Sequence, residues 1–447
     1  MPPNVVINLW RQRIGYGIAD LGCNLVWQML TIYLIFFYTE TMGIAAVQVS
    51  LLLLITRLID GGFDLLMGFI IDQTNTRWGK SRPYFLWGAF PFAIFSMLVF
   101  YVPPFSAAAK LAYAYMTYTA LSLCYTVVNM PLTSILPSLT NDVNERTVLA
   151  TSRILFSFIG ATIVGSLTIR LVYTFNEDGG SLGFFKTMII YGSVAAITLL
   201  ITFFNVKEAN PVITQQVPNK QSFRLLLKNT PWLLFAVNII FMWGAYFLQQ
   251  GSLVYFYTYT LKRPDLISII ITLTAVIPIA GTFLAPYLAR HFYKKNLFLL
   301  SSGVHLFGIL LIALSGSLIT GIVIGTIVSS IGFGLRHAIY FSMQADPVDY
   351  GEWKTGVNSA GMIAATNQFI GKIAMAGGGA IAGIVLTIGG YLPHQQQTAK
   401  TLLAININFL YLPAVLIIIS MTIMWFYKLD EIFAKVRSDL EHKSSKR

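Results

Sequence analysis

The sequence RLIDGGFDLLMGFIID, residues 57–72, places charged side chains inside a run that is otherwise almost entirely apolar. The apolar run begins near residue 45, so the whole segment is long enough to cross a bilayer as one helix. Arg57, Asp60 and Asp64 are spaced i, i+3 and i+7, which places them on one face of that helix. A charge at the centre of a membrane costs about 2.5–3.5 kcal/mol on insertion scales, so we expect these three to be paired, hydrated or used.

The rest of the chain has the same character. Its 447 residues are 56% hydrophobic and 11% charged, whereas soluble domains carry about 25% charged residues. The apolar runs are long and nearly unbroken, which favours helices over the alternating strands of a membrane β-barrel. We therefore predict an all-α membrane protein with about twelve transmembrane helices. The predicted spans are 14–38, 45–72, 84–103, 108–136, 149–173, 187–206, 231–260, 266–289, 297–315, 318–343, 358–388 and 404–427.

Basic residues predict how the spans are oriented. Most of the 30 Lys and Arg residues fall in alternate connections and near the chain ends, which predicts cytoplasmic termini and an even number of spans. The net charge of +12 then faces anionic inner-leaflet lipid, and this argues against a nucleic-acid partner. The first apolar segment is too long for a secretory signal. Cys23 and Cys124 both fall inside predicted spans, so we expect no structural disulfide.

The longest polar connection lies at the midpoint of the chain, with six predicted spans on each side. We predict a six-helix bundle at 1–206, a cytoplasmic linker at 207–230, a second six-helix bundle at 231–430 and a cytoplasmic tail at 431–447. The loops DQTNTRWGKSRP and RHFYKKN occupy equivalent places in the two halves and are both basic. Two six-helix halves joined in this way are the plan of the major-facilitator fold.

Two carboxylates one turn apart are suited to a cation. A proton binds a carboxylate more tightly when the group is buried beside a like charge, and Na⁺ requires several oxygen ligands. Asp60 and Asp64 fit either ion, unless Arg57 neutralises one of them and the trio only fixes helix packing. Arg153 and Lys372 have no carboxylate nearby in sequence, so we expect them to reach Asp60, Asp64 or a substrate across the bundle, unless their pairing is purely structural. Asp20 is equally a packing contact or a site residue.

Amide and aromatic side chains accompany these charges. The fourth span contains Tyr125, Thr126 and Asn129, the first contains Asn24, and the eleventh contains Asn367 and Gln368. Amides that bond hydroxyls, together with aromatic faces, are suited to a sugar. The sequence shows no metal-ligand cluster, nucleophile–base pair or phosphate loop, so we predict that the protein is not an enzyme.

The chain resembles the glycoside–pentoside–hexuronide:cation symporters, a major-facilitator branch that includes the melibiose and glucuronide carriers. The resemblance extends over nearly the whole chain. It is carried by IGYGIADLGCN, IYLIFFYTE, RLIDGGFDLLMGFIID followed by RWGKSRP, YTVVNMP, ADPVDYGEWKTG, and the Gly–Lys pair ending at Lys372. Asn358 and Ala360 depart from the family pattern after DYGE, where an Arg and a Glu are frequent.

The resemblance implies roles for particular residues. It implies a cation site at Asp60, Asp64 and Thr126, with any bound Na⁺ held there. Asn24 and Asn129 stand where the melibiose carrier has sugar-binding carboxylates. His337 stands in place of a tryptophan, and Arg336 beside it would suit a uronate or sulfonate, unless Arg336 pairs with a neighbouring helix. The expected substrate-binding residues are Asn24, Tyr125, Asn129, Arg153, Arg336, His337, Asn367, Gln368 and Lys372. The expected gate residues are Asp72, Arg77, Lys80, Asp346, Asp349 and Glu352.

The sequence therefore predicts a monomeric symporter in the cytoplasmic (inner) membrane of a bacterium. It would import a sugar or glycoside, such as a glucuronide or pentoside, with H⁺ or Na⁺ by alternating access, and would need no cofactor besides that ion. An uncoupled sugar facilitator and a transporter-like sugar sensor remain the alternatives.

Overall fold

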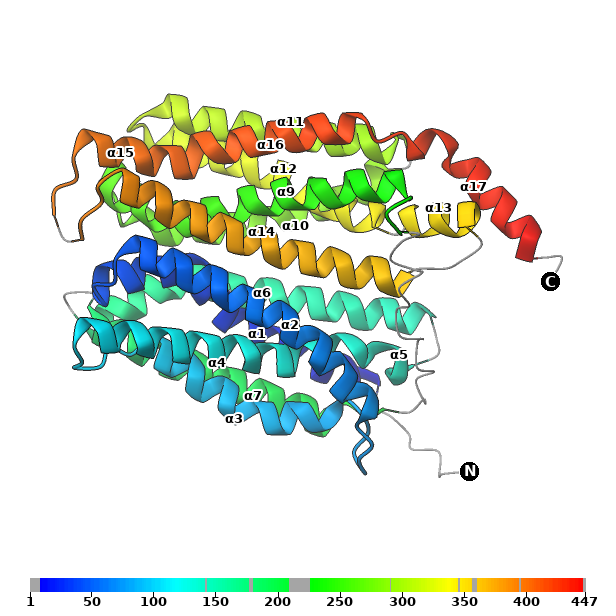
Figure 1. The fold of residues 1–447 in the computed structure, drawn as a ribbon, viewed down its shortest axis with the longest axis horizontal. Helices are drawn as coiled ribbons and strands as arrows, with labels where there is room; N and C mark the ends of the chain where they lie inside the picture. The colour runs from blue at the N-terminus through cyan, green and yellow to red at the C-terminus, as the bar shows by residue number, and fades with distance from the viewer. Residues whose placement is uncertain are drawn as a thin grey trace. The chain divides into compact units, whose positions relative to one another are not determined.

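The computed structural model describes residues 9–140, 143–176, 180–208, 226–289, 291–344, 346–355, 360–393 and 395–444. These residues fold into helices that form two compact units (Figure 1). The first unit contains α1 (Leu9–Phe36), the π-helix η1 (Phe37–Thr41), α2 (Ala46–Gln73), α3 (Arg82–Val99), α4 (Ala107–Ser134), α5 (Leu136–Leu139), α6 (Val143–Phe175) and α7 (Ser181–Asn205).

The second unit begins with α9 (Thr230–Tyr255) and the π-helix η2 (Phe256–Thr260), and it takes in α10 (Leu266–Leu288) from residue 273. The first unit also holds residues 264–272 and 390–397. The second unit continues with α11 (Lys294–Ser315), α12 (Ile319–Met343), α13 (Asp346–Thr355), α14 (Ala360–Ile388), α15 (Ala399–Asn406), the π-helix η3 (Ile407–Tyr411), α16 (Leu412–Trp425) and α17 (Leu429–Ser444).

The observed helices confirm the predicted all-α major-facilitator plan. Among the described residues, ten helices are long and apolar enough to cross a membrane. Helices α2 and α4 have 28 residues each, so they are also long enough to cross the hydrocarbon core. The largest differences from the predicted boundaries are at α6 and α7, which begin six residues before the predicted spans. The linker and domain boundaries stay a prediction, because residues 209–225 lie outside the described part of the chain.

Helix packing in the first unit brings the predicted cation-site residues together. Helix α2 packs against α4, while α1 packs against α6 and α7. Small residues allow the close contacts: a Cβ added at Gly22 of α1 would collide with the side chain of Thr198 on α7. Because α4 touches both α1 and α2, its polar side chains are positioned between the residues of those two helices.

Equivalent positions in the two units show the same local structures. The sequences FYTET in η1 and FYTYT in η2 both form a π-helix at the end of the first long helix of their unit. Their hydrogen bonds also match, since Ile44 N–H donates to Tyr38 O and Arg263 N–H donates to Tyr257 O, at 2.9 and 2.8 Å. This repeated local structure is stronger evidence for two related halves than the pair of basic loops in the sequence.

In each unit, a carboxylate that follows the sixth long helix also caps the N-terminus of the third long helix. Glu208, which follows α7, accepts hydrogen bonds from the backbone N–H groups of Lys80, Ser81 and Arg82 at the start of α3. Asp430, which follows α16, accepts one from the backbone N–H of Lys295 at the start of α11. A negative side chain at a helix N-terminus satisfies unpaired N–H groups and complements the helix dipole.

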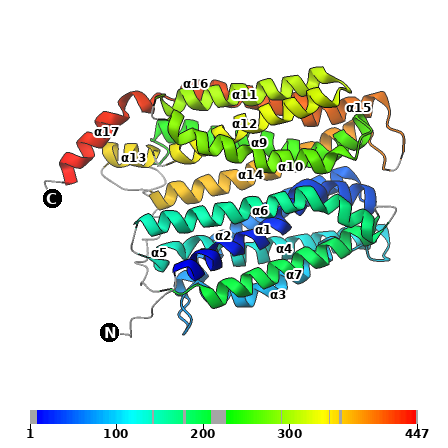
Figure 2. The same ribbon diagram turned by 180° about the vertical axis from the view of Figure 1, so that it is seen from behind.

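Two segments outside the predicted spans are also helices. The DYGE segment forms α13, and the expected cytoplasmic tail forms α17, which begins at residue 429. The two helices lie side by side beyond the end of the second bundle (Figure 1, Figure 2). Trp353 of α13 donates from Nε1 to Asp439 of α17 at 2.8 Å, and the apolar face of α17 is buried at Val436. Packing of this amphipathic face explains why a strongly charged sequence is helical here.

Candidate functional site

The predicted cation-site residues meet between α2 and α4 of the first unit. The hydroxyl of Thr126 on α4 lies 2.8 Å from Oδ1 of Asp60 and 3.1 Å from Oδ1 of Asp64. The side chains of Asp60 and Asp64 lie one helical turn apart on α2, and Asp60 is buried. Three side chains with acidic or hydroxyl oxygens thus converge: the two carboxylates whose spacing predicted a shared face, and the hydroxyl that the family resemblance implied.

Arg57 is a further member of this cluster. Its guanidinium lies 3.2 Å from Asp60 Oδ2 and donates a 2.9 Å hydrogen bond to the hydroxyl of Tyr118. Arg57 thus places one positive charge beside the two carboxylates of this cluster. Tyr118 was missed by the sequence argument. The sequence pattern that could have revealed it is the four-residue spacing of Tyr118, Ser122 and Thr126, which places the three side chains on one face of α4. Ser122 on this face also accepts a hydrogen bond from Arg57.

The carboxylate partner of Arg153 differs from the two that were expected. Arg153 on α6 was expected to reach Asp60 or Asp64, or else a substrate, and the carboxylate that it meets is Asp20 of α1, to whose Oδ2 its Nε donates at 2.7 Å. Its Nη2 donates to Asn129 Oδ1 on α4 at 3.1 Å. Asp20 is the partner of Arg153 because α1 packs directly against α6, which brings the two charged side chains together. Asp20 is therefore a partner of a predicted site residue.

An aromatic pair lies between these two charged groups. The rings of Trp27 on α1 and Tyr125 on α4 are stacked with centroids 4.9 Å apart. The guanidinium carbon of Arg57 lies 5.2 Å from the centroid of the Trp27 ring. Asn24, one turn before Trp27, donates to the backbone carbonyl of Asp20 at 2.9 Å. The first unit thus combines amides, charges and ring faces, which is the chemistry expected of a sugar site.

The predicted substrate residues of the second unit have different surroundings. His337 on α12 stacks on Phe333 and meets Trp243 of α9 edge-on, both at 5.6 Å between centroids. Arg336 beside it is 1% exposed. Asn367 on α14 is buried and accepts from Trp232 Nε1 at 3.1 Å, so its carbonyl oxygen fixes helix packing. Gln368 on α14 is exposed, and Lys372, one turn later, is half-buried.

Three of the predicted gate residues, Asp346, Arg77 and Lys80, contact residues of their own unit. Asp346 is buried and accepts hydrogen bonds from Lys294 Nζ at 2.7 and 2.8 Å. The guanidinium of Arg77 lies 4.6 Å from the ring centroid of Trp78. The backbone N–H of Lys80 bonds Glu208, as described above. Asp349 and Glu352 lie on α13, half-buried, whereas the side chain of Asp72 lies outside the described residues.

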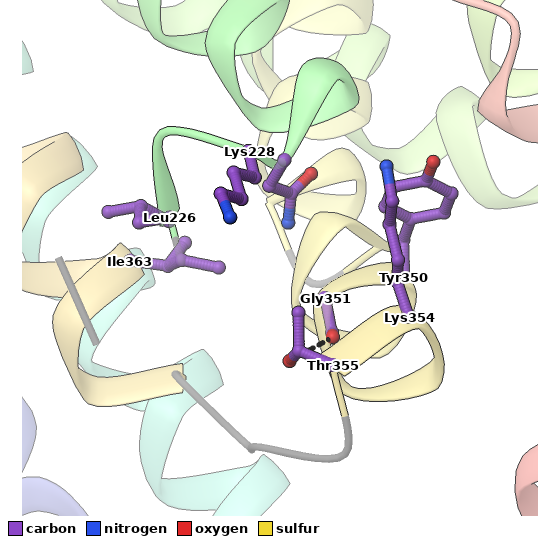
Figure 3. A pocket seen from close by; sticks show the side chains of 8 residues that line it. Leu226, Lys228, Tyr350, Gly351, Lys354, Thr355 and Ile363 are labelled. Atoms are coloured by element: carbon purple, nitrogen blue, oxygen red, sulfur yellow. Dashed lines mark hydrogen bonds between the residues drawn. The ribbon is translucent and has the colours of Figure 1, made fainter. Parts of the chain in front are cut away.

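A hollow lies at the start of α9, beside the α13 helix that carries Asp349 and Glu352 (Figure 3). Leu226 and Ile363 lie on one side of it, and Tyr350 and Lys354 lie on the other. The residues that line it are Leu226, Lys228, Asn229, Tyr350, Gly351, Lys354, Thr355 and Ile363. None of them was predicted as a site residue.

Comparison with known proteins gives consistent results. A family model described as MFS/sugar transport protein matches residues 15–431. The isoprimeverose transporter of Lactiplantibacillus pentosus is 38% identical over 97% of this chain and 92% of its own length. The glucuronide carrier protein homolog of Escherichia coli (strain K12) is 28% identical over 97% of this chain and 96% of its own. The crystal structure of a D-xylose-proton symporter covers 94% of this chain and 97% of its own with a TM-score of 0.68 and 11% identity, which concerns the fold alone.

Proposed function

The chain belongs to the MFS/sugar transport protein family, and we propose that it imports a sugar or glycoside together with one H⁺ or Na⁺ by alternating access. Membership makes it a multi-pass membrane transporter of sugars or glycosides with a cation, and not an enzyme. The proposal extends to the coupling ion, the substrate and the residues that bind them.

The convergence of Asp60, Asp64 and Thr126 carries the proposal. A cation bound there would add a positive charge beside the two carboxylates. Offsetting carboxylate charge lowers the cost of burying the cluster, which favours a closed, loaded state. Because coupling between two binding sites is reciprocal, a sugar that binds better to the cation-loaded protein must tighten cation binding by the same factor.

The sugar is proposed to bind beside Asn129, Arg153 and the Trp27–Tyr125 pair. Hydroxyl groups can accept from the guanidinium and bond the amide, and an apolar ring face can lie on the aromatic rings. Isoprimeverose is the first sugar to test, because a relative that transports it is similar over nearly the whole chain. A glucuronide is the second, because of the glucuronide carrier relative and the buried Arg336.

Counterflow and uptake in right-side-out vesicles test this function. We expect isoprimeverose or a glucuronide to accumulate against its gradient when a Na⁺ or H⁺ gradient is imposed. Asp60→Asn and Asp64→Asn should abolish accumulation, whereas Glu431→Gln, an exposed acid on α17, should leave it intact. Full uphill transport in both Asp→Asn proteins would reject the cation site.

The same assay separates the alternatives. An uncoupled facilitator would equilibrate the sugar in counterflow but would not accumulate it under any ion gradient. A sugar sensor would bind without counterflow. The proposed orientation, with both termini in the cytoplasm, is supported by the basic connections, and protease protection of terminal tags tests it.

A further inference from the structure

Three polar side chains lie near one another where α11 and α12 pack in the second unit: Ser302 and His305 of α11 and Arg336 of α12. The two backbones are close there, because a Cβ added at Gly332 would collide with the backbone nitrogen of His305. Arg336 follows Gly332 by one turn, and Ser302 precedes His305 by one turn. The guanidinium carbon of Arg336 and the ring of His305 lie 5.8 and 6.0 Å from the centroid of one ring, that of Phe333.

The polar atoms of this cluster are buried without hydrogen-bond partners among the described residues. They are Ser302 Oγ, both ring nitrogens of His305, and Nη1 and Nη2 of Arg336. Ser302, His305 and Arg336 are 0%, 4% and 1% exposed. Arginine stays charged in proteins, and a buried charge without a partner is very costly. The cluster therefore calls for a partner that carries negative charge.

The membrane helices of the second unit supply no carboxylate for this role. The sequence contains no Asp or Glu between residues 266 and 345, or between 353 and 429. Asp346 lies ten residues beyond Arg336, which is about 15 Å along a helix, and it already bonds Lys294. The hydroxyl of Ser302 and the imidazole of His305 offer hydrogen bonds but no carboxylate charge.

We propose that Ser302, His305 and Arg336 form a buried binding site for a small monovalent anionic group. The guanidinium supplies the charge and two N–H donors, and the hydroxyl and imidazole supply further donors. An inorganic halide and the carboxylate of an acidic sugar present the same chemistry to these donors. Binding of a halide at this site does not depend on the proposed symport, whereas binding of an acidic sugar rests on it.

Thermal unfolding of the full-length purified protein tests the site. The protein is heated in halide-free Tris sulfate with increasing potassium bromide, and in parallel with the potassium salt of a glucuronide, while potassium sulfate keeps the ionic strength constant. At 100 times its Kd, the anion is expected to raise Tm by about 3 °C. A rise with bromide identifies an inorganic anion, and a rise with the glucuronide alone identifies the sugar carboxylate. No rise with either anion would overturn the proposal.

Variants test whether the rise in Tm arises from binding at these three residues. Arg336→Gln should abolish the rise in Tm, and Ser302→Ala should raise the half-saturating anion concentration about tenfold. Ser301→Ala is the matched control, since the Ser301 hydroxyl donates to the backbone carbonyl of Phe298 and should not affect the rise. If Arg336→Gln does not fold, Ser302→Ala still decides the question. A rise that is unchanged in every folded variant would place the anion elsewhere and overturn the assignment, and the bromide result does not depend on transport.

Discussion

Replacing Thr126 by valine removes one oxygen from the proposed cation site with little change in volume. The lost hydroxyl lies 2.8 Å from Asp60 and 3.1 Å from Asp64, but it has one proton and donates to one carboxylate at a time. One hydrogen bond to a charged group contributes about 1.5–3 kcal/mol, which corresponds to about a 10- to 150-fold change in an equilibrium constant.

The direction of the change depends on the coupling ion. If Na⁺ is the ion, the hydroxyl is one of its ligands, and the half-saturating Na⁺ concentration rises about 10- to 150-fold in Thr126→Val. If H⁺ is the ion, the hydroxyl stabilises the ionised carboxylates, so its loss tightens proton binding. The pH of half-maximal uptake then moves up by about 1–2 units. The variant therefore distinguishes the two ions.

Initial rates of sugar uptake in vesicles provide the measurement, with Na⁺ varied at fixed pH and pH varied without Na⁺. Thr119→Val is the matched control, because Thr119 lies on the same helix and its hydroxyl bonds that of Thr56 at 3.1 Å. If Thr126→Val and Thr119→Val show the same Na⁺ and pH dependence, the hydroxyl takes no part in ion binding and the reasoning is refuted.

Three further predictions concern stability, measured as thermal unfolding of the purified protein. Asp20→Asn leaves Arg153 without its ionic partner. Because both side chains are partly exposed, we expect the free energy of unfolding to fall by at most about 3 kcal/mol, and an unchanged Tm would count against the pairing. Glu208→Gln weakens the cap on α3 and is expected to cost about 0.5–2 kcal/mol, and a neutral result would show that the cap is dispensable. Gly332→Ala forces α11 and α12 apart and is expected to cost about 1–3 kcal/mol, whereas Gly303→Ala, where a Cβ meets nothing within 4 Å, should cost much less. Equal effects of the two glycine substitutions would contradict the close helix approach.

Features that depend on one helix could be predicted from the sequence. Hydrophobic runs located the long helices, because lipid requires an apolar segment of fixed length. The spacing of Asp60 and Asp64 predicted one shared face, and Thr126 was added through resemblance. The structure brings these three together.

Features that depend on which helices pack together were beyond the sequence argument. Arg153 and Asp20 are 133 residues apart, and nothing in either segment identifies the other as a partner. The DYGE segment lies between two predicted spans, and nothing in its sequence identifies Lys294 as the partner of the buried Asp346. The repeated FYTET and FYTYT segments were visible in the sequence, but an apolar pattern alone does not indicate a π-helix.

The carboxylate caps have a consequence for how the chain is made. Glu208 is synthesised after all of α3 to α7, so the N–H groups at the start of α3 receive their protein partner last. Asp430 stands in the same relation to α11. Each cap is thus supplied by an acidic residue just past the last membrane helix of the same half of the chain. A nascent chain released before residue 208 or before residue 430 would therefore leave the first N–H groups of α3 or α11 without this acceptor.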